Sequence, residues 1–202
     1  MDPSSNSIPP QREGVQADII EMEIASDPQE AKLLFLKARE RLFDIAHWGD
    51  ISEGLSASFL LTDASGIRKE DFPEPGDHIR INIPGPGSEA GKGYDWVRVE
   101  LVEDKRSGAT DEEWSVMKVR PSEDPTNREG VAHFLENQAT SSFVIRRKDN
   151  TVSAEVHGRN EKPNTSAKKI TDKIRNALVG TAAAAGVGKI QWQKLAKGLL
   201  KN

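Results

Sequence analysis

The segment from Thr165 to Leu200 carries an unbroken helical pattern, and it constrains the fold more than any other part of the chain. Apolar or small residues recur in it at spacings of three and four, which places them on one face of an α-helix. These residues are Ile170, Ile174, Ala177, Leu178, Thr181, Ala185, Gly188, Trp192, Leu195 and Leu199. A straight helix of this length spans roughly 50 Å, unless Gly186 and Gly188 bend or end it. Its apolar face therefore needs a partner of similar length elsewhere in the chain.

The composition is that of a soluble protein with a single domain. The chain has 202 residues, of which 36% are hydrophobic and 30% are charged, and it has no cysteine. The lack of cysteine excludes disulfides, a thiolate nucleophile and cysteine-based zinc sites. No apolar run reaches the roughly 18 residues of a membrane span, and the first residues lack the pattern of a secretory signal. We therefore expect a cytoplasmic protein with a disordered, proline-containing tail over residues 1–16 and one domain over residues 17–202.

Positive charge is concentrated at the end of the chain. Residues 161–202 hold nine Lys and Arg against two acidic residues, although the whole chain has a net charge of -4. A basic helix that lies on an acidic body with its lysines in water explains this pattern, and a basic face for nucleic acid or anionic lipid is the alternative. The basic group Arg146–Lys148 with Arg159 lacks interleaved aromatic residues, so nucleic acid is not the partner that we expect.

The rest of the chain predicts one helical segment among strands. Ala17–Ile24 alternates as a half-buried strand does, with Ile20, Met22 and Ile24 on one side. Asp27–Glu30 has the pattern of a capped helix start, with Pro28 at the first helical position. The predicted helical segment extends to Glu53, and Gly49 is expected to form a left-handed cap near its end. Six further strands are expected at Leu55–Thr62, His78–Ile83, Tyr94–Glu103, Glu112–Arg120, Val131–Asn137 leading into Ser141–Lys148, and Thr151–Arg159.

Alternation within these strands predicts one dry and one wet face for the sheet. The dry face carries Ile79, Ile81, Ile83, Val97, Val99 and Leu101, and the wet face carries His78, Arg80, Asn82, Trp96, Arg98 and Glu100. Two long connections, Ser65–Gly76 and Pro121–Gly130, are rich in Pro, Gly and acidic residues and are expected to be the most mobile loops.

This order of elements resembles that of the START-like, or polyketide cyclase-like, superfamily. Ala25–Glu30 resembles its turn from the first strand into the first helix, and Trp48 resembles the tryptophan that follows the helix. The resemblance implies an α+β helix-grip fold, in which a curved antiparallel sheet of about seven strands wraps around a long C-terminal helix. It also implies an apolar cavity between helix and sheet, which in that superfamily binds lipids, hormones or polyketides or acts on them.

Small residues in the middle of the helical pattern indicate where such a cavity would lie. From Ala177 to Gly186 the bulky side chains are replaced almost throughout by Ala, Gly and Thr, so the sheet opposite either approaches closely or leaves space for a ligand. Tryptophans near this space serve as core anchors or as pocket walls. The candidate ligand-binding residues are Trp48, Phe59, Ile81, Val99, Met117, Ala177, Thr181, Ala185 and Trp192.

The sequence assigns no catalytic residue, metal or cofactor. Pro86–Gly93 departs from a phosphate-binding loop at two required positions, the four histidines lack ligand spacing, and no serine nucleophile motif occurs. The acidic clusters Glu103–Asp104 and Asp111–Glu113 flank a turn and are expected to be solvated.

Three functions remain open. The first is binding of a small apolar or amphipathic ligand in the cavity. The second is an enzyme of the cyclase or hydrolase type, which would need polar groups such as Arg98, Glu100 or His78 inside the same cavity. The third is a protein-interaction module whose core is filled by its own side chains.

Overall fold

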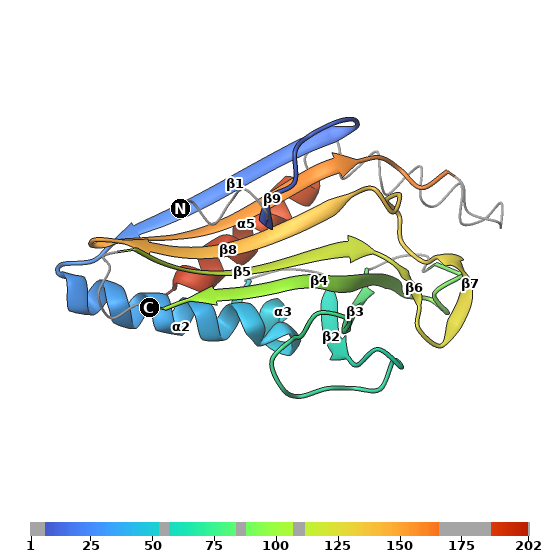
Figure 1. Ribbon diagram of the computed structural model, residues 1–202, viewed down its shortest axis with the longest axis horizontal. Helices are drawn as coiled ribbons and strands as arrows, with labels where there is room; N and C mark the ends of the chain where they lie inside the picture. Colours follow the sequence, from blue (N-terminus) through green and yellow to red (C-terminus); the bar gives the residue numbers. More distant parts are fainter. Residues whose placement is uncertain (1–6, 53–56, 84–87, 107–111, 166–186, 202) are drawn as a thin grey trace.

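The structure is a computed structural model that describes residues 7–52, 57–83, 88–106, 112–165 and 187–201. An antiparallel sheet of seven strands forms its centre, in the order β1-β9-β8-β5-β4-β3-β2 (Figure 1). The strands are β1 (Val15–Ile24), β2 (Ser58–Thr62), β3 (His78–Asn82), β4 (Asp95–Lys105), β5 (Glu112–Pro121), β8 (Thr140–Lys148) and β9 (Thr151–Glu161). A separate hairpin consists of β6 (Glu123–Asp124) and β7 (Asn127–Val131).

The helices lie on one side of this sheet, which we call the inner face. Helix α2 (Pro28–Phe43), the 3-10 turn η1 (Ile45–His47) and α3 (Trp48–Ile51) connect β1 to β2, and α5 (Val187–Leu200) contacts β1, β9, α2 and α3. This is the α+β helix-grip arrangement that the order of elements predicts, so the predicted fold is confirmed. The expected helix Thr165–Leu200 is described only in its last part, because residues 166–186 lie outside the described residues. No helix in the described part of the chain is long and apolar enough to span a membrane.

The start of α2 confirms the predicted cap. The carboxylate of Asp27 accepts hydrogen bonds from the backbone N–H groups of Gln29 and Glu30, both at 2.8 Å. The carboxylate of Glu30 accepts a hydrogen bond from the backbone N–H of Ser26 at 2.8 Å, which satisfies a further free donor at the helix start. The predicted left-handed cap at Gly49 is wrong, because Gly49 lies inside α3 and lacks a positive φ.

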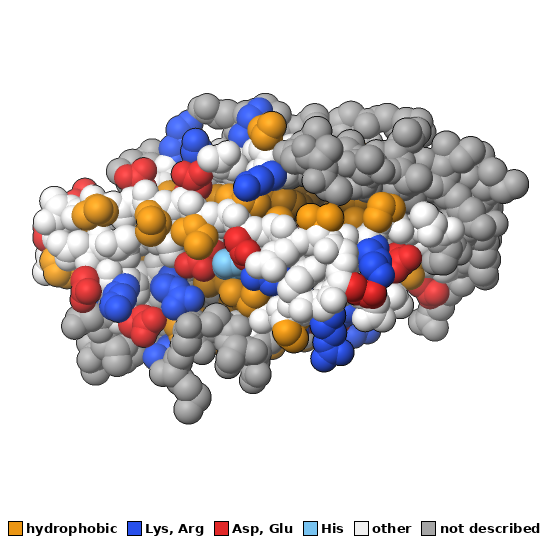
Figure 2. All heavy atoms as spheres, turned by 90° about the horizontal axis from the view of Figure 1, so that it is seen from above, with side chains coloured by type: hydrophobic (Ala, Val, Ile, Leu, Met, Phe, Trp, Pro, Cys, Tyr) orange, Lys and Arg blue, Asp and Glu red, His pale blue; other side chains and the backbone are white. Residues whose placement is uncertain are grey.

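Strand β1 faces the opposite way from the prediction. Ile20, Met22 and Ile24 are 52%, 64% and 80% exposed, whereas Ile19 is 5% exposed and belongs to the core. The register explains the difference, since Ile19 pairs with the core residue Val156, and a shift of one residue exchanges the two faces of a strand. Figure 2, which looks onto the molecule from the side of β1, shows separate hydrophobic side chains on this surface and a continuous hydrophobic strip near its middle.

Strand β4 departs from simple alternation at a bulge. Its register with β5 shifts between Val99 and Leu101, so Val102 packs against the core in the place expected for Leu101. Trp96 points away from the helices but is only 4% exposed, because neighbouring segments cover it. Its backbone N–H donates to Ala132 O at 2.7 Å, and its indole N–H donates to Gly91 O at 3.4 Å. The prediction that Trp96 is exposed to solvent is therefore wrong. A second layer of the chain lies over this part of the outer face.

The two long connections are held by specific contacts. Pro121–Gly130, expected to be a mobile loop, contains most of the β6–β7 hairpin. In Ser65–Gly76, Arg68 forms an isolated bridge with Thr62, and Lys69 pairs with the carboxylate of Asp77 at 2.8 Å.

Residues 7–14, which precede β1, contact the sheet along β9 and β8. The side-chain oxygen of Asn160 accepts a hydrogen bond from the backbone N–H of Arg12 at 2.8 Å. Ser7 is buried, and its carbonyl oxygen accepts a hydrogen bond from the hydroxyl of Ser142. These contacts are polar, so the composition of the segment, which predicts a disordered tail, gives no sign of them.

Candidate functional site

A row of aromatic rings lies between the helices and the inner face of the sheet. The ring centroid of Trp48 in α3 is 5.3 Å from that of Phe59 in β2 and 4.9 Å from that of Phe143 in β8. Phe143 in turn lies 5.4 Å from Trp192 of α5, edge to face. The indole N–H of Trp48 donates to Leu42 O at 3.1 Å, which satisfies the one polar group of a ring that is 1% exposed. Three predicted site residues are thereby brought together.

The other predicted residues divide into two groups. Val99 and Met117 are fully buried in the same core, and Ile81 is partly buried and packs against it. Ala177, Thr181 and Ala185 lie outside the described residues.

Phe143 is the member of the aromatic row that the sequence analysis missed. It shares the inner face of β8 with Ile145, and this alternation in the sequence could have identified it.

A carboxyl group lies on the inner face near the end of β9. A Cβ atom at Gly158 would come within 2.4 Å of Glu161 Oε1 and within 3.4 Å of Ala17 Cβ, so the carboxyl group of Glu161 fills the space that the missing side chain leaves. Burial raises the pKa of Glu161 to about 7, and the positive charge of Arg159 offsets only part of this effect. Among the residues that the structure describes, none donates a hydrogen bond to this carboxyl group. Glu161 is therefore neutral in a good part of the molecules near pH 7.

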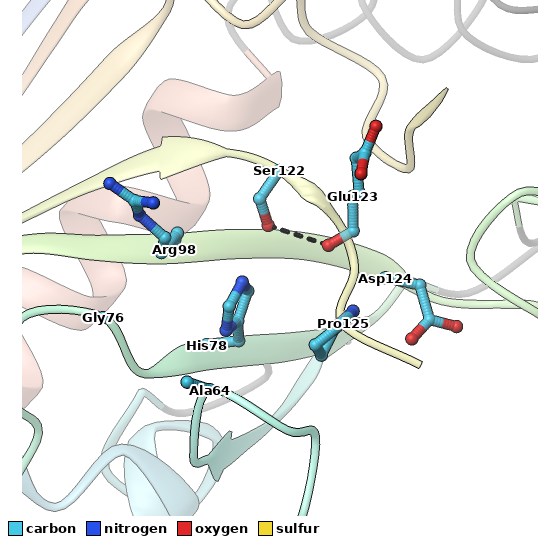
Figure 3. A pocket seen from close by; sticks show the side chains of 8 residues that line it. All are labelled: Ala64, Gly76, His78, Arg98, Ser122, Glu123, Asp124 and Pro125. Atoms are coloured by element: carbon cyan, nitrogen blue, oxygen red, sulfur yellow. Dashed lines mark hydrogen bonds between the residues drawn. The ribbon is translucent and has the colours of Figure 1, made fainter. Parts of the chain in front are cut away.

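The outer face, opposite the helices, carries a pocket of about 400 Å³ (Figure 3). Its lining is formed by Ala64, Gly76, His78, Arg98, Ser122, Glu123, Asp124 and Pro125. His78 and Arg98 are direct register partners on β3 and β4. They alternate with the core residues Ile79 and Val97, so their side chains project away from the inner face.

Polar groups predicted for an enzyme thus lie outside the helix–sheet space. His78 and Arg98 line the outer pocket, and Glu100 pairs with Arg120 and Lys118. Burial and the positive charge of Arg98 lower the pKa of His78, while the negative charge of Asp77 raises it to a smaller extent. The ring of His78 is therefore neutral at neutral pH. The expectation that these residues serve chemistry in the inner cavity is wrong.

A second group of titratable residues lies on the outer face of β1 and β9. His157 Nδ1 is 2.6 Å from Asp18 Oδ1, and His157 Nε2 is 3.0 Å from Glu155 Oε2. Burial alone lowers the pKa of His157, but the two carboxylates raise it overall. Burial alone raises the pKa of Asp18, but hydrogen bonds from His157 and Arg159 bring it down to about 2. These groups satisfy one another, which is typical of a structural ion-pair network.

Comparisons with solved structures find proteins of low sequence identity. The major latex-like protein 151 of Panax ginseng matches at 15% identity and a TM-score of 0.35, over 85% of this chain and 97% of that one. A truncated norcoclaurine synthase from Thalictrum flavum matches at 10% identity and a TM-score of 0.39, over 96% and 99% of the two chains. The di-domain ARO/CYC protein BexL matches at 14% identity and a TM-score of 0.42, over 93% of this chain and 50% of that one. No protein-family model and no curated protein matches the sequence. The helix-grip fold follows from this chain's own element order and sheet topology.

Proposed function

We propose that the protein binds a small apolar or amphipathic ligand between α5 and the inner face of the sheet. The ligand would contact Trp48, Phe59, Ile81, Val99, Met117 and Trp192, together with Ala177, Thr181 and Ala185, which lie outside the described residues.

The aromatic row is the observation that carries this proposal. The ring of Trp192 lies edge to face against Phe143 and is only partly buried, and Ile81 is also partly buried, whereas Trp48 and Phe143 are closed off from water. Partly exposed apolar side chains that adjoin a closed core support this proposal, because ligand pockets are lined mainly by hydrophobic and aromatic side chains. Glu161, a carboxyl group that is neutral up to about pH 7, could donate a hydrogen bond to a polar end of the ligand.

Binding of the dye anilinonaphthalene sulfonate to the folded chain tests the proposal, because its fluorescence rises in apolar surroundings. We expect dye binding to the native protein, displacement of the dye by oleate, and a rise in the melting temperature with oleate concentration. Trp192→Ala should weaken dye binding, and Ile81→Trp, which fills the space, should weaken it without opening the core.

Trp114→Ala is the matched control. Trp114 lies on the opposite face of β5 from the core residue Met117, so its loss should leave dye binding unchanged. The proposal would be ruled out if the native protein bound neither the dye nor oleate. It would also be ruled out if the Trp114 and Trp192 variants lost dye binding to the same extent. The first of these results would favour an interaction module with a filled core.

An enzyme of the cyclase or hydrolase type in the same space is a second candidate. Glu161 is the residue that favours it, because a carboxyl group with a pKa of about 7 suits general acid or base catalysis at neutral pH. Turnover of a bound compound that disappears in Glu161→Gln, while binding remains, would support catalysis. Binding without any turnover by the wild-type protein would leave ligand binding as the function.

A further inference from the structure

The outer pocket forms where the two long connections of the chain meet above β3 and β4. Ala64 and Gly76 belong to the connection after β2, and Ser122–Pro125 follow β5. The two connections touch at Gly66, where an added Cβ would come within 2.7 Å of Thr126 Cγ2. Figure 3 shows the ring of His78 rising from β3 toward Ser122, with Arg98 on one side and Asp124 and Pro125 on the other. A rigid sheet thus forms the floor and loops form the walls, as in many binding sites.

Arg98 brings a positive charge to this pocket. Its side chain is exposed, and within the described ranges no carboxylate lies at ion-pair distance from its guanidinium group. The nearby carboxylate of Glu100 instead pairs with Arg120 and Lys118. A guanidinium group presents a planar pair of donors that matches a carboxylate, so Arg98 is suited to hold an organic acid.

His78 brings a hydrogen-bonding group that lacks a partner. Its Nδ1 is buried and has no hydrogen bond within the described part of the chain, although the ring lines the pocket. Because the ring is neutral at neutral pH, Nδ1 can accept a hydrogen bond when Nε2 carries the proton. A buried nitrogen without a partner costs free energy, and a ligand hydroxyl would remove that cost.

Acidic groups on the far side of the pocket limit the charge of the ligand. Glu123 and Asp124 both line the pocket, and Asp124 is fixed by hydrogen bonds from the backbone N–H of Thr126 at 2.7 Å and from its hydroxyl at 2.8 Å. These carboxylates disfavour an anion with a second negative charge. The pocket is therefore matched to a singly charged acid that also carries a hydrogen-bond donor.

We propose that this pocket binds a small hydroxycarboxylate, whose carboxylate pairs with Arg98 and whose hydroxyl donates a hydrogen bond to His78 Nδ1. The site is independent of the proposed apolar site, because its side chains project from the opposite face of the sheet. A volume of about 400 Å³ accommodates a larger substituent beyond the hydroxyacid group itself.

Titration of the full chain with three probes, followed by NMR, tests this assignment. The probes are glycolate, acetate, which lacks the hydroxyl, and inorganic phosphate, which carries more negative charge. We expect glycolate to shift the ring signals of His78 and the amide signals of Ser122–Asp124, with an affinity about tenfold or more above that of acetate and phosphate. Arg98→Ala should weaken glycolate binding about tenfold or more, and His78→Phe should bring glycolate down to the affinity of acetate.

Arg80→Ala is the matched control for removal of a positive charge. Arg80 lies on the same face of β3 as His78, outside the pocket lining, and its guanidinium stacks on Tyr94 at 4.2 Å. This variant should bind glycolate as the wild type does. The proposal is overturned if glycolate causes no shift at His78, if acetate or phosphate binds as tightly as glycolate, or if Arg80→Ala loses as much affinity as Arg98→Ala.

Discussion

Glu113 of β5 and Lys32 of α2 form an ion pair that fastens the first long helix to the inner face of the sheet. The Glu113 side chain is fully buried, and Arg147 of β8 contacts its other oxygen at 2.8 Å. Burial alone raises the pKa of Glu113, but hydrogen bonds from Lys32 and Arg147 lower it overall, so the carboxylate remains charged. Arg39, also on α2, pairs with Asp104 of β4 at 2.7 Å and extends the same connection.

Loss of the Glu113 carboxylate should be strongly destabilising. Glu113→Ala removes the buried carboxylate that pairs with both Lys32 and Arg147, and removal of one member of a buried pair costs about 3–5 kcal/mol. Glu112→Ala is the control, because its pair with Arg146 is longer, at 3.4 Å, and more exposed, and should cost less than about 1 kcal/mol. Urea unfolding measures both changes, and equal effects would show that the pair with Glu113 is not what holds α2 to the sheet.

Adjacent isoleucines in β1 should respond very differently to truncation. Ile19→Ala removes a buried side chain and should lower the free energy of unfolding by about 2–4 kcal/mol. Ile20→Ala, at a position that is 52% exposed, should change it by less than about 0.5 kcal/mol. The same unfolding experiment decides the register of β1, since the reverse order of effects would mean that Ile20 faces the core.

Gly198 should not tolerate a side chain. A Cβ atom there would lie 2.1 Å from the carbonyl oxygen of Ile51, so Gly198→Ala would push α5 away from α3. We expect a loss of about 1–3 kcal/mol, as is usual for overpacking, whereas Lys197→Ala at the exposed neighbouring position should have little effect. A melting temperature for Gly198→Ala equal to that of the wild type would contradict the close contact of the two helices.

The contribution of Glu161 to stability should fall as the pH rises from about 4.5 to about 7. Because the pKa of Glu161 is about 7 in the folded state and about 4.5 in the unfolded chain, the folded state binds more protons between these values. Stability from this group is complete below pH 4.5 and is lost as the pH passes through 7.

Glu161→Gln should remove this part of the pH dependence, as measured by urea unfolding at a series of pH values. Glu23→Gln, in an exposed position on β1, should leave the dependence unchanged. An identical slope in the wild type and in Glu161→Gln would show that folding does not raise the pKa of Glu161.

The local features of the fold could be read from the sequence, whereas the contacts between distant segments could not. Caps and alternation are properties of neighbouring residues, so the start of α2 and most strands were predicted correctly. Two adjacent isoleucines give β1 an apolar residue for either face, and only its pairing with β9 selects Ile19 for the core. Arg41 donates a hydrogen bond to Leu199 O at 3.2 Å, and no local pattern in the sequence indicates this contact across most of the chain.

The same limit applies to the two candidate sites. Trp48, Phe59 and Trp192 could be selected because tryptophans and inner-face residues are visible in the pattern, although Phe143, which joins them, was missed. Glu113 was expected to be solvated because it lies beside a turn. Its partner Lys32 is 81 residues away, so no local pattern reveals the pair. The outer pocket depends on the meeting of two loops, for which the sequence contains no local signal.

The indole signals of the four tryptophans offer the most direct test of ligand binding between α5 and the sheet. Trp48 and Trp192 adjoin the proposed site, while Trp96 and Trp114 lie on the outer face. Titration of the protein with oleate, followed by NMR of the indole N–H groups, should shift the signals of Trp48 and Trp192 and leave those of Trp96 and Trp114 in place. No shift at Trp192 on saturation with oleate, or shifts confined to Trp96 and Trp114, would contradict the proposed function.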